Sequence, residues 1–247
     1  MEGRNYPALL FILFLLHLLY HTPEMGIADN ITGLRNQIPP HIRIIAVSKT
    51  MPVSTLMEAY QSGQRAFGEN KVQELLQKQP LMPEDTEWHM IGHLQTNKVK
   101  YVVPFISLIH SVDSLKLLTE INREAAKINR VTDCLLQLHI ATEETKFGLS
   151  FSEAEEILNS GEFRSFKNVR ITGLMGMATF TDQPAIIEKE FAYLATCFKE
   201  LKNKWFSGNN AFCEISMGMS GDYQVAIAAG STMVRIGSLI FGERQYK

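Results

Sequence analysis

The sequence predicts an α/β fold, a single (β/α)8 barrel of the TIM type. Short apolar runs alternate with helical stretches from residue 42 onward, eight times, with no clear linker and no break in composition. Repeated strand-then-helix units favour a parallel sheet covered by helices, and eight units in roughly 220 residues suit a closed barrel. The glycine fingerprint of a dinucleotide-binding sheet does not follow the first strand, so an open doubly wound sheet is the weaker alternative.

Eight short strands are predicted, and the first is an apolar run rich in branched residues, which is typical of a strand buried on both faces. The eight strands cover residues 42–48, 65–69, 87–92, 106–112, 133–141, 169–177, 212–218 and 233–242. Helices are predicted over 53–63, 71–79, 94–103, 115–129, 152–161, 184–204 and 222–230, and a further helix over 27–37 precedes the first strand. Proline and glycine mark several helix ends, as Pro52, Gly63, Pro80 and Pro104 do.

Composition narrows the class of protein. The chain has 247 residues, of which 45% are hydrophobic and 20% charged, so it can bury a sizeable core as a soluble globular domain. The net charge of -2 and the scattered basic residues give no sign of a nucleic-acid partner. Cys134, Cys197 and Cys213 have no CxxC spacing, which indicates reduced, buried thiols in a reducing compartment such as the cytoplasm.

Residues 1–24 do not match this picture. Residues 8–20 form an almost unbroken apolar run preceded by Arg4. The run has the length of a signal-peptide core and is short for a membrane span, which takes roughly 20 residues, and a poor cleavage site follows it. We therefore favour a third interpretation, in which Met25 is the true start and residues 1–24 are translated upstream sequence. The predicted barrel domain covers residues 25–247, and no stable membrane association is expected.

Lys49 is the sharpest candidate functional residue. It follows the first apolar strand, and active sites of such barrels lie at the carboxyl ends of the strands. Desolvation there would lower the pKa of the lysine amine and make it a better Schiff-base nucleophile. The structural alternative is a rim lysine paired with a carboxylate such as Glu69.

A second candidate is a phosphate site near the ends of the last two strands. Ser216 and Ser220, with Gly230, Ser231 and Thr232, offer hydroxyl and backbone N–H groups. Phosphate sites in these barrels recur in the loops after strands seven and eight. The alternative is that they are ordinary turn and helix-cap residues.

Arg235 lies inside an apolar strand and needs a partner, since an unpaired buried charge is costly. That partner is either Glu214 across the barrel or a ligand anion or ring nitrogen, and the sequence favours neither. His89 and His93 are spaced for metal binding on a helix, but their segment reads as strand and turn. A polar or ligand-orienting role for His89 is therefore favoured over a metal site.

Six motifs together carry a resemblance that the separate residues do not. They are AVSKT (46–50), FGENKVQE (67–74), WHMIGHLQTNK (88–98), KFGL (146–149), GLMGMAT (173–179) and SMGMSGDYQVAIAAGSTMVRIGSLIFGER (216–244). In this order they resemble the YggS/PROSC family of pyridoxal 5′-phosphate (PLP) homeostasis proteins, from about Met25 to Arg244. The resemblance implies a fold-type III PLP barrel, as in the N-terminal domain of alanine racemases, without their second β-domain. Residues 1–24 have no counterpart in the family pattern.

The resemblance also implies roles for individual residues. It implies a PLP-linked lysine at Lys49, phosphate-holding segments at Ser216, Gly230, Ser231 and Thr232, a cofactor-side arginine at Arg235, pocket positions at Asn70, His89 and Ile91, and a lysine that helps PLP enter or leave at Lys146. Met51 stands where the family often has a second lysine, so any role of that lysine in PLP exchange is in doubt here.

The implied function is intracellular PLP homeostasis, with apo PLP-dependent enzymes as recipients and a monomeric carrier. An arginine at the pyridine nitrogen would keep that nitrogen unprotonated, which weakens carbanion chemistry and suits a carrier. An amino-acid racemase of the alanine racemase type is the main alternative. It would need a tyrosine as second acid/base, but Tyr60, Tyr101 and Tyr223 are predicted on helices away from the pocket. A Schiff-base aldolase that holds a sugar phosphate is the third hypothesis.

Overall fold

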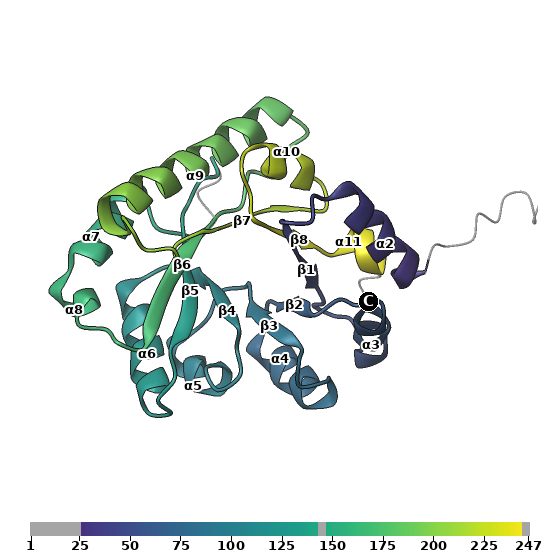
Figure 1. Cartoon of the computed structure of the whole chain (residues 1–247), viewed down its shortest axis with the longest axis horizontal. Coiled ribbons are helices and arrows are strands. Elements are labelled where there is room, and N and C mark those ends of the chain that lie inside the picture. The colour runs from purple at the N-terminus through teal and green to yellow at the C-terminus, as the bar shows by residue number, and fades with distance from the viewer. Residues whose placement is uncertain (1–25, 143–146, 244–247) are drawn as a thin grey trace, which may run out of the picture.

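The computed structural model describes residues 26–142 and 147–243. Within them, eight parallel strands form a closed barrel in chain order, and helices surround it (Figure 1). The predicted (β/α)8 barrel is therefore confirmed, and the open sheet is excluded. The predicted extension over residues 1–24 lies outside the described residues, as does Lys146.

The strands that form the barrel wall are short, with four to seven residues each. They are β1 (Arg43–Val47), β2 (Ala66–Glu69), β3 (Glu87–Met90), β4 (Leu108–Val112), β5 (Thr132–Gln137), β6 (Val169–Met175), β7 (Glu214–Met219) and β8 (Met233–Ile236). Every strand pairs in parallel with its neighbour in sequence, and β8 closes the barrel against β1 from Arg43↔Met233 to Ala46↔Ile236. All eight carboxyl ends therefore meet at one end of the barrel.

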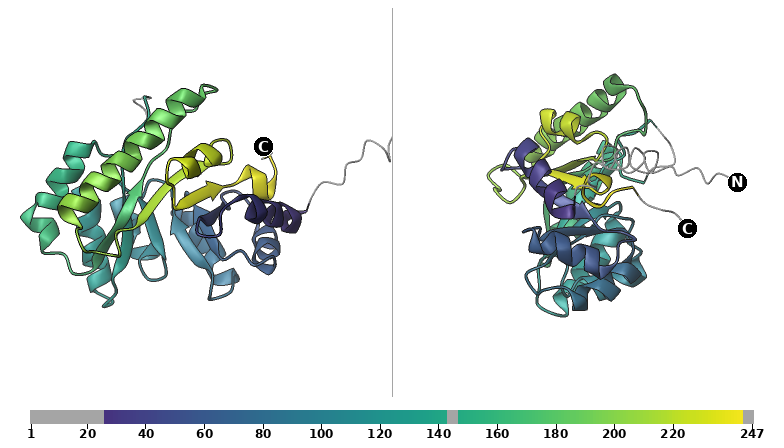
Figure 2. Two further views of the ribbon diagram at one scale, coloured as in Figure 1. Left: turned by 45° about the horizontal axis from the view of Figure 1, so that its top comes forward. Right: turned by 90° about the vertical axis from the view of Figure 1, so that its right-hand side faces the viewer.

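Helices follow the strands around the outside (Figures 1 and 2). They are α2 (Ile27–Gln37), α3 (Val53–Gln61), α4 (Val72–Lys78), α5 (Val99–Val102), α6 (Leu115–Ala126), α7 (Phe151–Asn159), α8 (Gly161–Arg164), α9 (Pro184–Trp205), α10 (Tyr223–Ala228) and α11 (Ser238–Phe241), with 3-10 turns η1 (Gln79–Leu81) and η2 (Thr96–Lys98). Because α11 is only one turn long, α2 lies beside it and completes the ring (Figure 1). Of the helices described, none has the length and apolar character needed to cross a membrane.

Local sequence explains where several helices begin. The hydroxyl of Ser114 accepts the N–H of Leu117 and so caps the start of α6. Ser150 and Glu153 form a capping box at the start of α7. Pro184 is the first residue of α9, where its fixed φ and missing N–H cost nothing.

The core has two layers. The larger hydrophobic cluster joins the outer faces of the strands to the apolar faces of the helices. A smaller cluster lies among the strands and takes one residue from each of six of them, namely Ile45, Ala66, Leu108, Leu135, Met175 and Met233. Inward-pointing layers of this kind fill a barrel interior and leave no pore.

Three predictions from the sequence are wrong in detail. The last strand ends at Ile236, and residues 238–241 turn into α11 where the sequence predicts strand up to residue 242. The helix predicted over 94–103 is a 3-10 turn followed by a single α-turn. Cys134 and Cys197 are free and buried as expected, but the free Cys213 is exposed.

Candidate functional site

A cavity of about 680 Å³ opens at the carboxyl ends of the strands. Lys49, Asn70 and Ile91 line it from the ends of β1, β2 and β3, and Arg235 lines it from β8. Lys49 and Arg235, singled out by their chemistry, thus meet Asn70 and Ile91, implied by the resemblance, at the end where barrels of this kind hold their ligands. The remaining lining residues come mainly from the segments after β6, β7 and β8.

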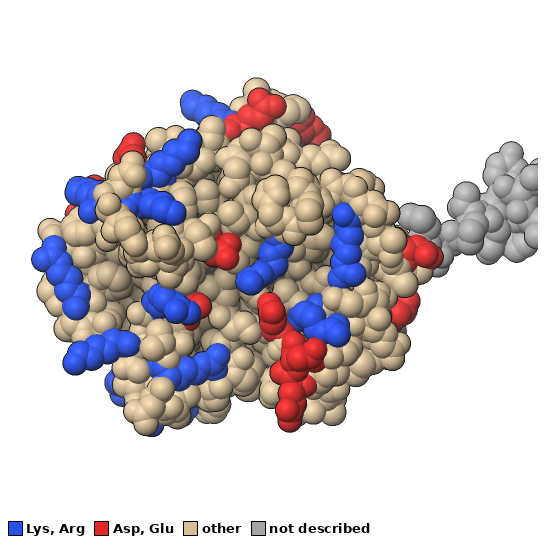
Figure 3. Space-filling view, in the orientation of Figure 1, with Lys and Arg blue, Asp and Glu red and all other residues tan. Residues whose placement is uncertain are grey.

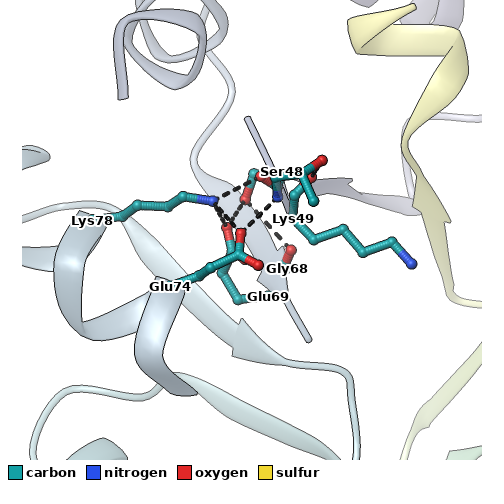
Figure 4. Close-up of polar contacts among 7 residues, drawn as sticks. Ser48, Lys49, Gly68, Glu69, Glu74 and Lys78 are labelled. Carbon is teal, nitrogen blue, oxygen red and sulfur yellow. Dashed lines mark hydrogen bonds and ion pairs between the residues drawn. The ribbon is translucent and has the colours of Figure 1, made fainter. Parts of the chain in front are cut away.

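Lys49 leaves the end of β1 on the side of this cavity. Figure 4 shows its side chain pointing away from Glu69 and Glu74, toward the C-terminal segment drawn in yellow. Glu69, the carboxylate that the sequence offered as a structural partner, instead binds Lys78, with 2.8 Å between Nζ and Oε1. Glu69 is therefore not the carboxylate that pairs with Lys49.

The turn that carries Lys49 is held by a polar cluster (Figure 4), which consists of Ser48, Glu69, Glu74 and Lys78. The Lys78 ammonium donates to the backbone oxygen of Ser48 at 2.9 Å. Thr50 has a φ of 66°, a left-handed conformation that costs a residue with a side chain about 1–3 kcal/mol. Its N–H donates to Oε2 of Glu74 at 2.6 Å, which stabilises that conformation. Helix α4 therefore fixes the backbone on both sides of Lys49.

Within this cluster, Glu69 and Lys78 form an ion pair that is largely shielded from water. The side chain of Glu69 is 0% exposed and that of Lys78 is 8% exposed. Burial raises the pKa of Glu69, and hydrogen bonds from Lys78 and Ser48 offset only part of this rise. Burial also acts to raise the pKa of Glu74, but the Thr50 N–H and Lys78 outweigh it, so this pKa is lowered.

Arg235 is a buried cation whose described hydrogen bonds go to neutral groups. One terminal nitrogen donates to the Ser216 backbone oxygen at 2.9 Å and to the Ser216 hydroxyl at 2.7 Å, and the other donates to the Gly176 oxygen at 3.1 Å. Burial lowers its pKa to about 10, so the guanidinium stays charged at neutral pH. Glu214 accepts a hydrogen bond from Thr232 instead, which removes the structural ion pair proposed for Arg235.

Two loops bring hydroxyl and backbone N–H groups to the same cavity. Ser220 and Gly221 follow β7, and Gly237 and Ser238 follow β8. The hydroxyl of Ser220 accepts the N–H of Gly237 at 3.2 Å, which ties the two loops together. Gly237 and Ser238 are not among the predicted site residues, since the last predicted strand runs through both. Ending that strand at the glycine after Ile236 would have placed both at the cavity.

Gly230, Ser231 and Thr232, the predicted phosphate-holding residues, lie at the opposite end of the barrel and are not among the residues that line the cavity. They precede β8, so they belong to its amino end. The Thr232 oxygen accepts the N–H of Arg43, where β1 begins, at 2.9 Å. The buried Ser231 hydroxyl lies 2.8 Å from the backbone oxygens of Met217 and Met233. These residues hold the barrel wall together.

His89 and Ser216 lie inside the barrel, beneath the cavity. Nδ1 of His89 is 2.8 Å from Nε2 of His110, whose Nδ1 is 2.9 Å from the Ser216 hydroxyl. His89 borders a hollow at the amino ends of the strands and is not among the residues that line the cavity, although the resemblance implies a pocket position for it. Ser216 reaches the cavity only through Arg235. No group of three or more His, Cys, Asp or Glu within residues 26–142 and 147–243 is arranged to hold a metal ion.

Comparison with known proteins decides the family. The family model for the alanine racemase N-terminal domain matches residues 26–245. The chain belongs to this family. Members similar to it include the pyridoxal phosphate homeostasis protein of Aquifex aeolicus, 41% identical over 206 residues that cover 83% of this chain and 88% of the relative. The protein of the same name from Escherichia coli K12 is 36% identical over 235 residues, covering 89% and 97%.

Solved structures of the alanine racemase N-terminal domain family agree with this placement. PipY of Synechococcus elongatus is 36% identical, and its structure without PLP covers 88% of this chain and 100% of PipY with a TM-score of 0.82. The structure of PipY with PLP bound has a TM-score of 0.79 over the same shares. An alanine racemase of Clostridium difficile, at 13% identity and a TM-score of 0.67, shows the shared fold alone. The resemblance found in the sequence motifs is confirmed.

Proposed function

We propose that this chain binds PLP in the cavity at the carboxyl ends of the strands, covalently through Lys49, and serves PLP homeostasis with little or no catalysis. The observation that carries the proposal is the meeting of Lys49, Arg235 and the loops after β7 and β8 around one cavity. PLP brings an aldehyde that condenses with a primary amine, a phosphate ester, and a pyridine ring that can draw electrons from a bound amine.

The residues fit that group. A cavity of about 680 Å³ lies within the usual range for small-molecule sites, roughly 300–1,000 Å³. Lys49 supplies the amine, and the hydroxyl and N–H groups of Ser220, Gly221, Gly237 and Ser238 supply donors for a phosphate. Asn70 and Ile91 line the same cavity and would form part of its wall. Lys146, beyond the described residues, remains a proposed aid to PLP entry or release.

Arg235 is the reason to propose a carrier. Its guanidinium stays charged in the barrel interior and carries only donors. A ring nitrogen beside it would have to accept a hydrogen bond and would therefore stay unprotonated, because two adjacent cations disfavour each other. The pyridine ring would then draw electrons weakly, and carbanion chemistry would be slow.

The racemase alternative lacks its second acid/base in the described part of the chain. Tyr60, Tyr101 and Tyr223 lie on α3, α5 and α10, as predicted, and Tyr193 lies on α9. None of these four described tyrosines lines the cavity. Tyr223 contacts Gln37 on α2, with 3.2 Å between the hydroxyl and the amide oxygen, on the outside of the barrel.

The proposal extends to partners and place of action. Apo enzymes that use PLP are the proposed recipients, and the chain is proposed to act in the cytoplasm as a monomer, without stable membrane association or nucleic-acid binding. Figure 3 shows basic side chains spread over the face in view and interspersed with acidic ones, which supports the last point.

Titration of the purified full chain with PLP, followed by visible absorption, tests the proposed function. We expect a new absorption band that saturates at one PLP per chain. Pyridoxal, which lacks the phosphate, should bind at least about tenfold more weakly, since it loses charge-assisted hydrogen bonds worth ~1.5–3 kcal/mol. An unchanged spectrum with PLP would overturn the proposal, and an equal response to pyridoxal would remove the phosphate site. Rapid interconversion of L- and D-alanine would contradict the carrier role.

A further inference from the structure

A chain of buried hydrogen bonds runs from Arg235 through the barrel interior. It passes from the guanidinium to the Ser216 hydroxyl at 2.7 Å, from there to Nδ1 of His110 at 2.9 Å, and from Nε2 of His110 to Nδ1 of His89 at 2.8 Å. Ser216, His110 and His89 are each 0% exposed. Such a chain is strong only when every donor faces an acceptor.

The chemistry of Arg235 sets the direction of this chain. A guanidinium only donates, so the Ser216 hydroxyl oxygen accepts from it and turns its own proton toward His110. Nδ1 of His110 must then accept, which leaves its proton on Nε2 to face Nδ1 of His89. His89 in turn carries its proton on Nε2. In the reverse order the Ser216 oxygen would accept from both Arg235 and His110, and its own proton would have no acceptor among the hydrogen bonds of the described residues.

The far end of the chain agrees with this direction. Nε2 of His89 is buried and has no hydrogen-bond partner within the described residues. It lies 3.9 Å from the Glu87 carboxylate, beside a hollow of about 270 Å³ at the amino ends of the strands. A proton on Nε2 therefore points toward a negative charge. Every dipole in the chain turns its negative end to Arg235 and its positive end to Glu87.

Both histidines are held neutral. Burial lowers the pKa of His89, with Arg43 acting in the same direction and Glu87 and Glu214 against it. Burial also places the pKa of His110 well below its usual value, and the positive charges of Arg235 and Arg43 add to this effect. A neutral imidazole has one donor and one acceptor, which the directed chain requires at both positions.

We propose that Ser216, His110 and His89 are positioning residues that hold the Arg235 guanidinium at the cavity through this one-way hydrogen-bond chain. The chain places an acceptor dipole at the guanidinium, and the charge of Asp222 acts in the same direction by raising the pKa of Arg235 against the effect of burial. The inference deepens the proposed function, since it rests on Arg235 facing the pyridine nitrogen of PLP.

The first test reads the proton positions and needs no cofactor. Long-range ¹H–¹⁵N NMR correlation of the labelled full chain should show His89 and His110 as neutral Nε2–H tautomers between about pH 6 and 8. His93→Ala, a surface change, serves for assignment and should leave both signals in place. An Nδ1–H tautomer at His110, or a charged imidazolium at either site, would overturn the proposed hydrogen-bond chain. If the protein bound no PLP, the NMR result would still decide the inference separately.

The second test measures how loss of the hydrogen-bond chain affects PLP binding. His110→Leu removes both hydrogen-bonding nitrogens, and we expect it to weaken PLP binding about tenfold and to alter the pH dependence of the visible band. His110→Gln can accept from Ser216 and donate to His89, so it should bind within about threefold of the unchanged protein. Equal affinity and an unaltered pH profile in His110→Leu would contradict the positioning role. If His110→Leu did not fold, the NMR result on the unchanged protein would decide the inference alone.

Discussion

Lys49→Ala is expected to abolish the visible absorption band that PLP produces on the unchanged chain. The substitution removes the amine that the aldehyde needs, while the cavity and its phosphate donors remain. Residual binding should be non-covalent and at least about 100-fold weaker, since covalent capture and the charge at this position are lost together. Absorption titration and equilibrium dialysis of the variant measure the two effects separately.

Two matched controls sharpen this experiment. Lys49→Arg keeps a positive charge at the end of β1 but offers no amine that condenses at neutral pH, so it should also lack the band. Lys71→Ala removes an exposed lysine outside the cavity lining and should leave the titration unchanged. Persistence of the band in Lys49→Ala would move the anchor to another lysine.

Lys78→Met is expected to lower the free energy of unfolding by about 3–5 kcal/mol, because it leaves a buried carboxylate without its cation. Glu69 is fully buried, and Lys78 is the ammonium that binds it at 2.8 Å. The same change removes the donor that holds the Ser48 oxygen beside Lys49. PLP affinity should therefore fall along with stability. Urea unfolding followed by circular dichroism measures the first effect.

The pH dependence of that loss has a definite sign. Burial already raises the pKa of Glu69, and removing the lowering effect of Lys78 raises it further. Between the unfolded and the folded pKa the folded variant binds a proton that the unfolded chain releases, so its stability falls as pH rises through the folded pKa. The deficit against the unchanged protein should be smaller at about pH 5 than at about pH 8.

A double variant isolates the cause. Glu69→Gln in the Lys78→Met background removes the buried charge and should recover more than about half of the lost stability. It should also remove the additional pH dependence. A double variant as unstable as Lys78→Met at both pH values would show that packing, and not the uncompensated charge, is responsible.

The barrel could be predicted because the sequence patterns that indicate its strands and helices are local. The strands are short, largely apolar runs and several helices have their own start or stop residues, so the order of elements follows from the sequence alone. The ends of elements were less predictable, since they depend on tertiary contacts. The predicted strand over 233–242 includes Gly237 and Ser238, which follow β8 at the cavity. The predicted phosphate site therefore used Gly230–Thr232, which precede β8 at the opposite end of the barrel.

The site was predictable only where a residue's chemistry conflicts with its local surroundings. Lys49 after an apolar strand and Arg235 within one are conspicuous in any reading, and both line the cavity. The partners of these residues were not predictable. His110 and Ser216 are 106 residues apart, and their contact depends on which faces of β4 and β7 point inward. Lys78 looks like an ordinary helix-end lysine until α4 is packed against β1 and β2.

Reduction of the PLP-treated full chain with borohydride, followed by peptide mapping, shows directly whether Lys49 is the lysine that binds PLP. Reduction makes the bond between lysine and PLP permanent, so mass spectrometry identifies the lysine that carries it. We expect one modified lysine per chain, in the peptide that contains Lys49, and none in Lys49→Ala. A modification confined to another lysine, or spread over surface lysines with Lys49 unmodified, would contradict it.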